Sequence, residues 1–399
     1  MIKEKHKKIV PALILFLSIT LFAGAGCSLQ PQGNGPISKL TAKGKTDASQ
    51  PMQTTMGYGS AAYLHSAVKK ARFGSGNEEY WIFEPESPSP QTAPVVIFNH
   101  GWGAMNPGIY GGWVEHLVKR GNIVIYPRYQ ENLRTSPTLF TDNALTAIKN
   151  AFEELGSDDH VRPDYKKVAV IGHSIGGIVS VNIAARMTSL GIPKAKAVMS
   201  IQPGKTWSHI ERVNMPLEDL STIPTELLLL VVVGDKDMIV KDIDAQKIFY
   251  QTTTIPLKNK DFITVQSDDH GTPPLVANHG SPASFLKTLD VAQDSQPSFE
   301  PSFRERLGTR IRSRLKNRVQ EKLEDVVTSE EGVPIITAEN ATTNALDYYG
   351  YWRLFDALMN AAFTGTDRDA ALGNTEKQRF MGIWSDGTPV SELMVTDTP

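Results

Sequence analysis

The stretch Val168 to Gly177, VAVIGHSIGG, places Ser174 between two glycines directly after a run of small apolar residues. This Gly-x-Ser-x-Gly spacing is typical of a serine held on a sharp turn between a strand and a helix, where its hydroxyl can attack a carbonyl carbon. Such a short pattern also occurs by chance, so it needs the right surroundings. Acyl transfer through Ser174 would require a base, an orienting acid and amides that bind the developing oxyanion.

The acid and the base are expected after later strands. The stretch LLLLVVVGDKDMIV is typical of a buried strand and is followed by Asp235 and Asp237, which are rival candidates for the acid. The stretch DFITVQSDDHG places His270 just beyond the next predicted strand. His279, inside PPLVANHG, is a rival base that lies further from the strand end, and we therefore predict His270 as the base.

The oxyanion donors are expected beside the serine and after an early strand. The predicted strand Val95 to Asn99 runs into His100-Gly101-Trp102-Gly103. The backbone amides of Trp102 and Ile175 are the predicted donors, and each such donor typically lowers a barrier by about 3 kcal/mol.

A second group of residues is expected near the substrate. The stretch SIQPGKTW follows the strand after the nucleophile, so Gln202, Gly204 and Trp207 are predicted to line the acyl or alcohol pocket. An ordinary loop with a packed tryptophan is the alternative. His173 and His100 are interpreted as structural side chains, and Asp268 and Asp269 as charges that could perturb His270.

The elements that must position these residues alternate along the chain. Short apolar runs recur from residue 77 to residue 266, and between them apolar residues recur at steps of three and four, as in Leu145, Ile148 and Phe152. Continuous apolar runs favour parallel strands covered on both faces. The pattern predicts an α/β fold, a doubly wound and mostly parallel sheet with helices on both faces, whose ligands bind at the carboxyl ends of the strands.

Residues 77–363 resemble the α/β-hydrolase superfamily of serine esterases and lipases. The stretches HGWGAMNPGIYGGWVEHLVKRGNIVIYPRY, GHSIGG and GDKDMIV are similar to those of its chlorophyllase-like, polyester-hydrolase-like and platelet-activating-factor-acetylhydrolase-like members. The resemblance implies Ser174 as nucleophile, Asp237 as acid, His270 as base, and Trp102 and Ile175 as oxyanion donors. It does not imply a particular substrate, a cofactor or a metal.

The composition excludes some other classes of protein. A net charge of -2 over 399 residues gives no basic face of the kind that nucleic-acid binding needs. The single cysteine excludes an intrachain disulfide and a cysteine-based metal cage. We expect no cofactor and no nucleic-acid partner.

The first residues resemble a secretory signal. A lysine-rich start, a short apolar run and the small residues AGAGC end at Cys27, the position of the lipid-modified cysteine of bacterial lipoproteins. Residues 1–27 are therefore predicted as a lipoprotein signal, 28–55 as a flexible tether and 56–399 as a single domain, exported and anchored to a membrane in the bacterial cell envelope. Ordinary cleavage, giving a secreted soluble protein, is the alternative.

An insertion at residues 281–340 interrupts the pattern before the last helix, which is predicted over 344–363. Its segment 303–327 is strongly basic and is predicted to be helical. It is interpreted as a solvated surface helix, with contact to anionic lipid head groups as the alternative.

These features predict a serine hydrolase of carboxylic esters, acting on a small-molecule or lipid ester. Amide, thioester or peptide hydrolysis by the same residues remains an alternative, because the three side chains do not select among these substrates. A second alternative is a binding protein that has this fold but does not catalyse a reaction.

Overall fold

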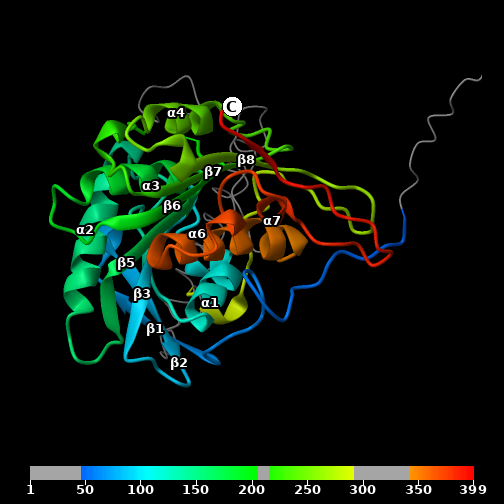
Figure 1. Cartoon of the computed structure of the whole chain (residues 1–399). Coiled ribbons are helices and arrows are strands. Elements are labelled where there is room, and N and C mark those ends of the chain that lie inside the picture. Colours follow the sequence, from blue (N-terminus) through cyan, green and yellow to red (C-terminus); the bar gives the residue numbers. More distant parts are fainter. Residues whose placement is uncertain (1–45, 205–214, 292–340) are drawn as a thin grey trace, which may run out of the picture. The chain divides into compact units, whose positions relative to one another are not determined.

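The structure is a computed structural model that describes residues 46–204, 215–291 and 341–399 (Figure 1). These residues belong to one compact unit, Gly44–Pro399. The predicted signal with Cys27, the residue Trp207 and the basic segment 303–327 lie outside the described residues.

A mixed, mostly parallel sheet forms the centre of the described unit. Its strand order is β1-β2-β4-β3-β5-β6-β7-β8-β9. β3 to β8 run parallel to one another, whereas β1, β2 and β9 pair in antiparallel fashion at the two edges. The strands are β1 (Ala67–Phe73), β2 (Tyr80–Glu86), β3 (Thr92–Asn99), β4 (Ile123–Pro127), β5 (Arg162–His173), β6 (Ala195–Ile201), β7 (Leu228–Gly234), β8 (Lys260–Val265) and β9 (Met394–Thr396). This α/β-hydrolase order confirms the predicted fold class.

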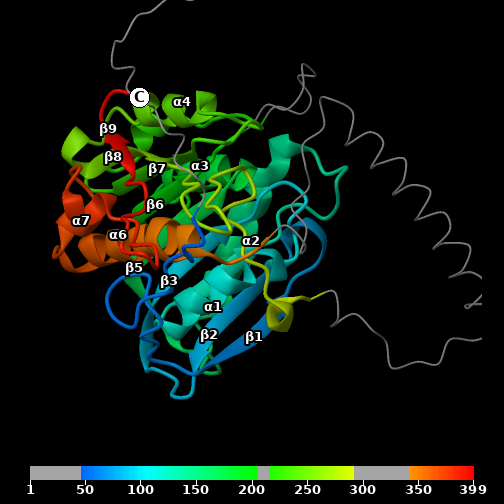
Figure 2. The same cartoon turned by 90° about the vertical axis from the view of Figure 1, so that its right-hand side faces the viewer.

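Helices cover both faces of the sheet, because successive residues of a strand point to opposite sides. In β3, Val96 and Phe98 join the core under α1 and α6, whereas Val95 and Ile97 join the core under α2, α3 and α4 (Figures 1 and 2). The helices are α1 (Gly111–Lys119), α2 (Phe140–Glu154), α3 (Ile175–Arg186), α4 (Ile243–Gln251), α6 (Trp352–Thr364) and α7 (Glu376–Arg379). A π-helical turn, Leu346–Tyr351, leads directly into α6.

The structure corrects the end of the predicted tether 28–55. Residues 46–55 pack on the domain: the amide and hydroxyl of Thr46 donate hydrogen bonds of 2.9 and 2.8 Å to the carbonyl of His270, and Ala48 is buried. Many of these contacts are hydrogen bonds to backbone carbonyls, which a polar composition does not reveal. The domain therefore begins about ten residues before the predicted boundary at residue 56.

The tail after α6, which the family resemblance does not cover, packs against the last parallel strand. β9 pairs with β8, and Trp384 is buried against Gly271, where an added Cβ would lie 2.3 Å from the indole ring. The tail thereby reaches the loop that follows β8.

Within the described ranges, no helix combines the length and the apolar character that a membrane span needs.

Candidate active site

Ser174 lies on a strained turn between β5 and α3. Its φ of 58° and ψ of -126° place a residue that has a side chain in a region that favours glycine, at a typical cost of about 1–3 kcal/mol. The glycines around it are required by space: a Cβ at Gly172 would lie 2.1 Å from the carbonyl oxygen of Gly176, and one at Gly176 would lie 2.3 Å from that of Asn99. The predicted strand, turn and helix are therefore all present around the serine.

Ser174, His279 and Asp237 form a continuous hydrogen-bonded chain. Ser174 Oγ lies 3.0 Å from His279 Nε2, and His279 Nδ1 lies 2.8 Å from Asp237 Oδ2. The side chain of Asp237 is fully buried, that of His279 is 6% exposed, and Ser174 is 2% exposed as a residue. Each ring nitrogen of His279 has one partner, which fixes the orientation of the ring.

Asp237 is held in its charged form. Burial raises the pKa of this carboxyl, but the hydrogen bond and charge of His279 and the amides of Val240 and Ile239 outweigh it, so that its pKa lies below the usual value of 3.8. The amides of Ile239 and Val240 donate to Oδ1 at 2.9 and 3.2 Å. The second oxygen, Oδ2, is thereby left to accept from His279. The rival Asp235 instead accepts hydrogen bonds of 3.0 and 2.5 Å from the amide and hydroxyl of Ser267.

The structure does not bring His270 to the serine. His270 Nε2 lies 2.7 Å from Oδ2 of Asp386, which belongs to the C-terminal tail. Its Nδ1 is buried and has no hydrogen-bond partner among the described residues. The prediction of His270 beside Ser174 is therefore wrong, and its rival His279 occupies that position.

The path of the chain after β8 explains this correction. Asp268 and Leu275 exchange two backbone hydrogen bonds of 2.9 and 2.8 Å, so that residues 269–274 form an excursion that carries His270 away from the sheet. The chain then returns, and the carbonyl of Ala277 accepts from the amide of Lys236 at 3.1 Å, directly beside the end of β7. The number of residues between the end of β8 and a histidine therefore did not identify the base. The prolines of TPPLVANHG were the missed indication that the chain turns back after His270.

The loop that carries His279 is anchored from two sides. The carbonyl of Asn278 accepts from Gln202 Nε2 at 2.9 Å and from Ser281 Oγ at 2.7 Å. Ser281 Oγ also lies 2.6 Å from the hydroxyl of Tyr351, which ends the π-helical turn before α6. No local sequence pattern predicts a role for Ser281 and Tyr351, because their contacts depend on how the last helix packs.

Gln202 and Gly204, the two predicted pocket residues that the structure describes, are both buried. Gln202 is completely buried, and both ends of its amide are used, since Oε1 lies 3.2 Å from His173 Nε2 and Nε2 donates to Asn278. Gly204 is buried against Val240, where an added Cβ would lie 2.1 Å from a methyl carbon. Both residues thus make contacts within the protein around the turn of Ser174, and their role in lining the pocket stays a prediction.

Two further histidines stay neutral behind the turn. Burial lowers the pKa of His173 to about 3 and that of His100 to about 4. The hydroxyl of Tyr110 lies 2.9 Å from His173 Nδ1, and the two ring nitrogens of His100 face the carbonyls of Gly101 and Arg128 at 2.7 Å each. A neutral ring carries one N–H, so His100 donates to one of these two carbonyls. These hydrogen bonds agree with the structural roles predicted for both residues.

The loop after β3 reaches the serine, as the predicted oxyanion site requires. A Cβ added at Gly101 would lie 3.4 Å from Ser174 Cβ, and Trp102 follows directly. Ile175 is the first residue of α3, and an amide in the first turn of a helix has no acceptor within that helix. Both predicted donors therefore belong to segments that contact or follow Ser174.

Metal ligands do not cluster in this part of the protein. Across residues 46–204, 215–291 and 341–399, His, Cys, Asp and Glu side chains form no group of three that could hold a metal ion.

A comparison with protein families matches part of the chain. A family model described as chlorophyllase matches residues 53–230, a range that contains Ser174 but ends before Asp237 and His279. Together with the strand order, it confirms the resemblance to the α/β-hydrolase superfamily and supports a hydrolase of the ester type.

A curated relative and a solved structure are more distant. The non-reducing polyketide synthase ascC of Acremonium egyptiacum is 24% identical over 126 residues, which cover 30% of this chain and only 6% of that protein. A crystal structure of a variant of the esterase rPPE is 13% identical, with a TM-score of 0.40, and covers 52% of this chain and 75% of that chain.

Proposed function

We propose that the protein is a serine hydrolase of carboxylic esters in which Ser174, His279 and Asp237 act together. The observation that carries this proposal is the buried hydrogen-bonded chain from Asp237 through His279 to a serine on a strained turn. The match to the chlorophyllase family model favours an ester over the other acyl substrates that such residues can cleave.

In the proposed first half-reaction, Ser174 Oγ forms a bond to the ester carbonyl carbon while its proton passes to His279 Nε2. Asp237 stabilises the resulting imidazolium across the 2.8 Å hydrogen bond to Nδ1. The amides of Trp102 and Ile175 would bind the negatively charged oxygen of the tetrahedral intermediate. When the intermediate collapses, the bond to the alcohol oxygen breaks and His279 gives its proton to the leaving alcohol.

In the proposed second half-reaction, water replaces the alcohol. His279 takes a proton from water, the hydroxide attacks the acyl-enzyme, and the carboxylic acid leaves as the proton returns to Ser174 Oγ. The buried positions of Asp237 and His279 support this cycle because a charge pair is strengthened where water is excluded.

We also propose that the protein is exported and anchored to a membrane through lipid at Cys27. This part rests on the sequence of the first residues alone. Membrane-fraction recovery of the full chain and of Cys27→Ala would test it, and equal recovery of the two proteins would contradict it.

Hydrolysis of a p-nitrophenyl ester series tests the catalytic proposal. Ser174→Ala should lower kcat by about 10⁶-fold, because the nucleophile is lost while the fold is kept. Ser189→Ala is the matched control, since Ser189 is an exposed serine that follows α3. Equal kcat values for wild type and Ser174→Ala would contradict the proposal, and a higher kcat/KM for matched p-nitroanilides than for the esters would redirect it to amides.

A further inference from the structure

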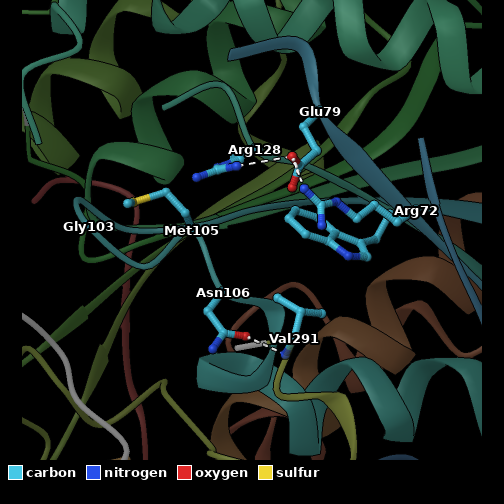
Figure 3. Close-up of a pocket in the computed structure, with 8 residues that line it drawn as sticks. Arg72, Glu79, Gly103, Met105, Asn106, Arg128 and Val291 are labelled. Atoms are coloured by element: carbon cyan, nitrogen blue, oxygen red, sulfur yellow. Dashed lines mark hydrogen bonds and ion pairs between the residues drawn. The ribbon is translucent and has the colours of Figure 1, made fainter. Parts of the chain in front are cut away.

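Apart from the site of Ser174, a pocket lies at the same edge of the sheet. Its cavity is about 260 Å³ and is lined by Arg72, Glu79, Trp81, Gly103, Met105 and Arg128, among others (Figure 3). Arg72 comes from β1, Glu79 precedes β2 and Arg128 follows β4. None of these side chains takes part in the proposed reaction of Ser174.

Positive charge is in excess among the residues that line this pocket. Arg72 and Arg128 both reach the same oxygen of the Glu79 carboxylate, at 2.7 and 3.0 Å, as Figure 3 shows. One carboxylate thus faces two guanidiniums. The side chain of Glu79 is buried, with only 3% of it exposed, whereas that of Arg72 is 53% exposed. The pocket keeps one positive charge that Glu79 does not balance.

One hydrogen-bond donor of a lining residue also remains without an acceptor in the described ranges. Arg128 uses its two terminal nitrogens on Glu79 and on the carbonyl of Glu131, but its buried Nε has no partner among the described residues. Unpartnered buried donors are rare in proteins. Gln130, which is completely buried and does not line the pocket, positions Gly103, because its Oε1 accepts from the amide of Gly103 at 2.9 Å.

The loop of the proposed oxyanion site joins this pocket to the serine. A Cβ added at Gly101 would lie 3.4 Å from Ser174 Cβ. Gly103, two residues later in the same loop, lines the pocket. Neighbouring strands lie about 4.8 Å apart, so the backbone of Arg128 after β4, two strands from β5, lies about 10 Å from that of Ser174, and the backbone of Arg72 on β1, four strands from β5, lies about 19 Å from it. A long-chain substrate can span these distances.

We propose that the pocket binds a free carboxylate of the ester substrate, at a distance of about 10–19 Å from the carbonyl that Ser174 attacks. The guanidiniums of Arg72 and Arg128 supply charge-assisted hydrogen bonds to that carboxylate, and Met105 and Trp81 supply apolar contacts to the chain that leads to it. The substrate class is thus an ester that carries a second acidic group. This inference rests on the proposed function of Ser174.

Pairs of esters of equal length test the inference. In the acyl arm, p-nitrophenyl monoesters of dicarboxylic acids from sebacic to hexadecanedioic acid are compared with p-nitrophenyl esters of the methyl-ended acids. In the alcohol arm, acetates of hydroxy fatty acids are compared with acetates of the matching alcohols. The arm in which wild type prefers the acid-ended ester identifies the half of the substrate that carries the carboxylate.

Three variants connect this preference to the pocket. Arg72→Gln should lower the kcat/KM ratio of acid-ended to methyl-ended ester about tenfold, the loss expected for one hydrogen bond to a charged group. Glu79→Gln should raise the ratio because it removes the competing carboxylate. Arg162→Gln, at the far end of β5, is the control and should leave the ratio unchanged.

The possible outcomes separate the two proposals. If wild type hydrolyses methyl-ended esters but shows no preference for the acid-ended partner in either arm, or if Arg72→Gln leaves the preference intact, the carboxylate site is wrong and the proposed function stands. If wild type hydrolyses none of the esters, the proposed function fails. Titration calorimetry with sebacic acid monomethyl ester then decides the site, because equal binding by wild type and Arg72→Gln would overturn it.

Discussion

Two histidines that follow β8, His279 and His270, each pair with an aspartate, and the surroundings of the two pairs differ. In the pair of Asp237 and His279, the carboxylate is fully buried and both ring nitrogens have partners, one of them Ser174. In the pair of Asp386 and His270, the carboxylate is 38% exposed and one ring nitrogen has no partner in the described ranges. The hydrogen-bond distances, 2.8 and 2.7 Å, are nearly the same.

Distance within a pair therefore does not distinguish a candidate catalytic histidine from a structural one. What distinguishes His279 is the third group, Ser174, and the exclusion of water from Asp237. The pair of His270 and Asp386 joins the excursion after β8 to the C-terminal tail, beside the carbonyl of His270 that holds Thr46. Its role in the structure is to connect segments that are distant in sequence.

Replacement of each carboxylate by its amide should give the largest difference between the two pairs. Asp237→Asn should lower kcat by about 10⁴-fold, because an amide neither orients His279 with its proton on Nδ1 nor stabilises its charged form. Asp386→Asn should change kcat less than about threefold, as expected for an exposed pair. Steady-state kinetics on one p-nitrophenyl ester measures both. Losses of similar size in the two variants would remove the distinction.

The buried histidines behind the first pair predict how stability depends on pH. Burial lowers the pKa of His173 to about 3 and that of His100 to about 4, from 6.5 in the unfolded chain. Below pH 6.5 the unfolded state therefore binds more protons than the folded state, and stability falls as pH falls. Each histidine should contribute a slope of about 1.4 kcal/mol per pH unit between pH 6.5 and its folded pKa.

Urea unfolding of wild type and His173→Gln from pH 5 to pH 6.5 measures this slope. His173→Gln should lose about half of the pH slope that the two histidines contribute to the free energy of unfolding, whatever its stability at pH 7. Equal slopes of unfolding free energy against pH for the two proteins would show that His173 is not held neutral by its surroundings.

The sequence predicted the elements of the site better than their assembly. The apolar runs identified the parallel strands, and the position of Ser174 between a strand and a helix followed from its glycines, because a sharp turn leaves no room for side chains there. The end of β7 identified Asp235 and Asp237 as rival acids, and the family resemblance selected Asp237 between them.

The remaining site residues depend on tertiary contacts that no local pattern encodes. His270 and His279 are separated by an excursion that two backbone hydrogen bonds close, and the C-terminal tail supplies the partner of His270 from 116 residues away. Gln202 follows a strand end like Asp237 does, yet its side chain turns inward to His173 and Asn278. The signal at residues 1–27 and the lipid at Cys27 stay predictions.

Labelling with a fluorophosphonate probe tests the central claim most directly, because the probe reacts with a serine that a neighbouring histidine activates. We predict that wild type and His270→Gln form the adduct on Ser174 at similar rates, located by peptide mass spectrometry. His279→Gln should form almost none. Rapid labelling of His279→Gln together with loss of labelling in His270→Gln, or an adduct on another residue of the wild type, would contradict the account.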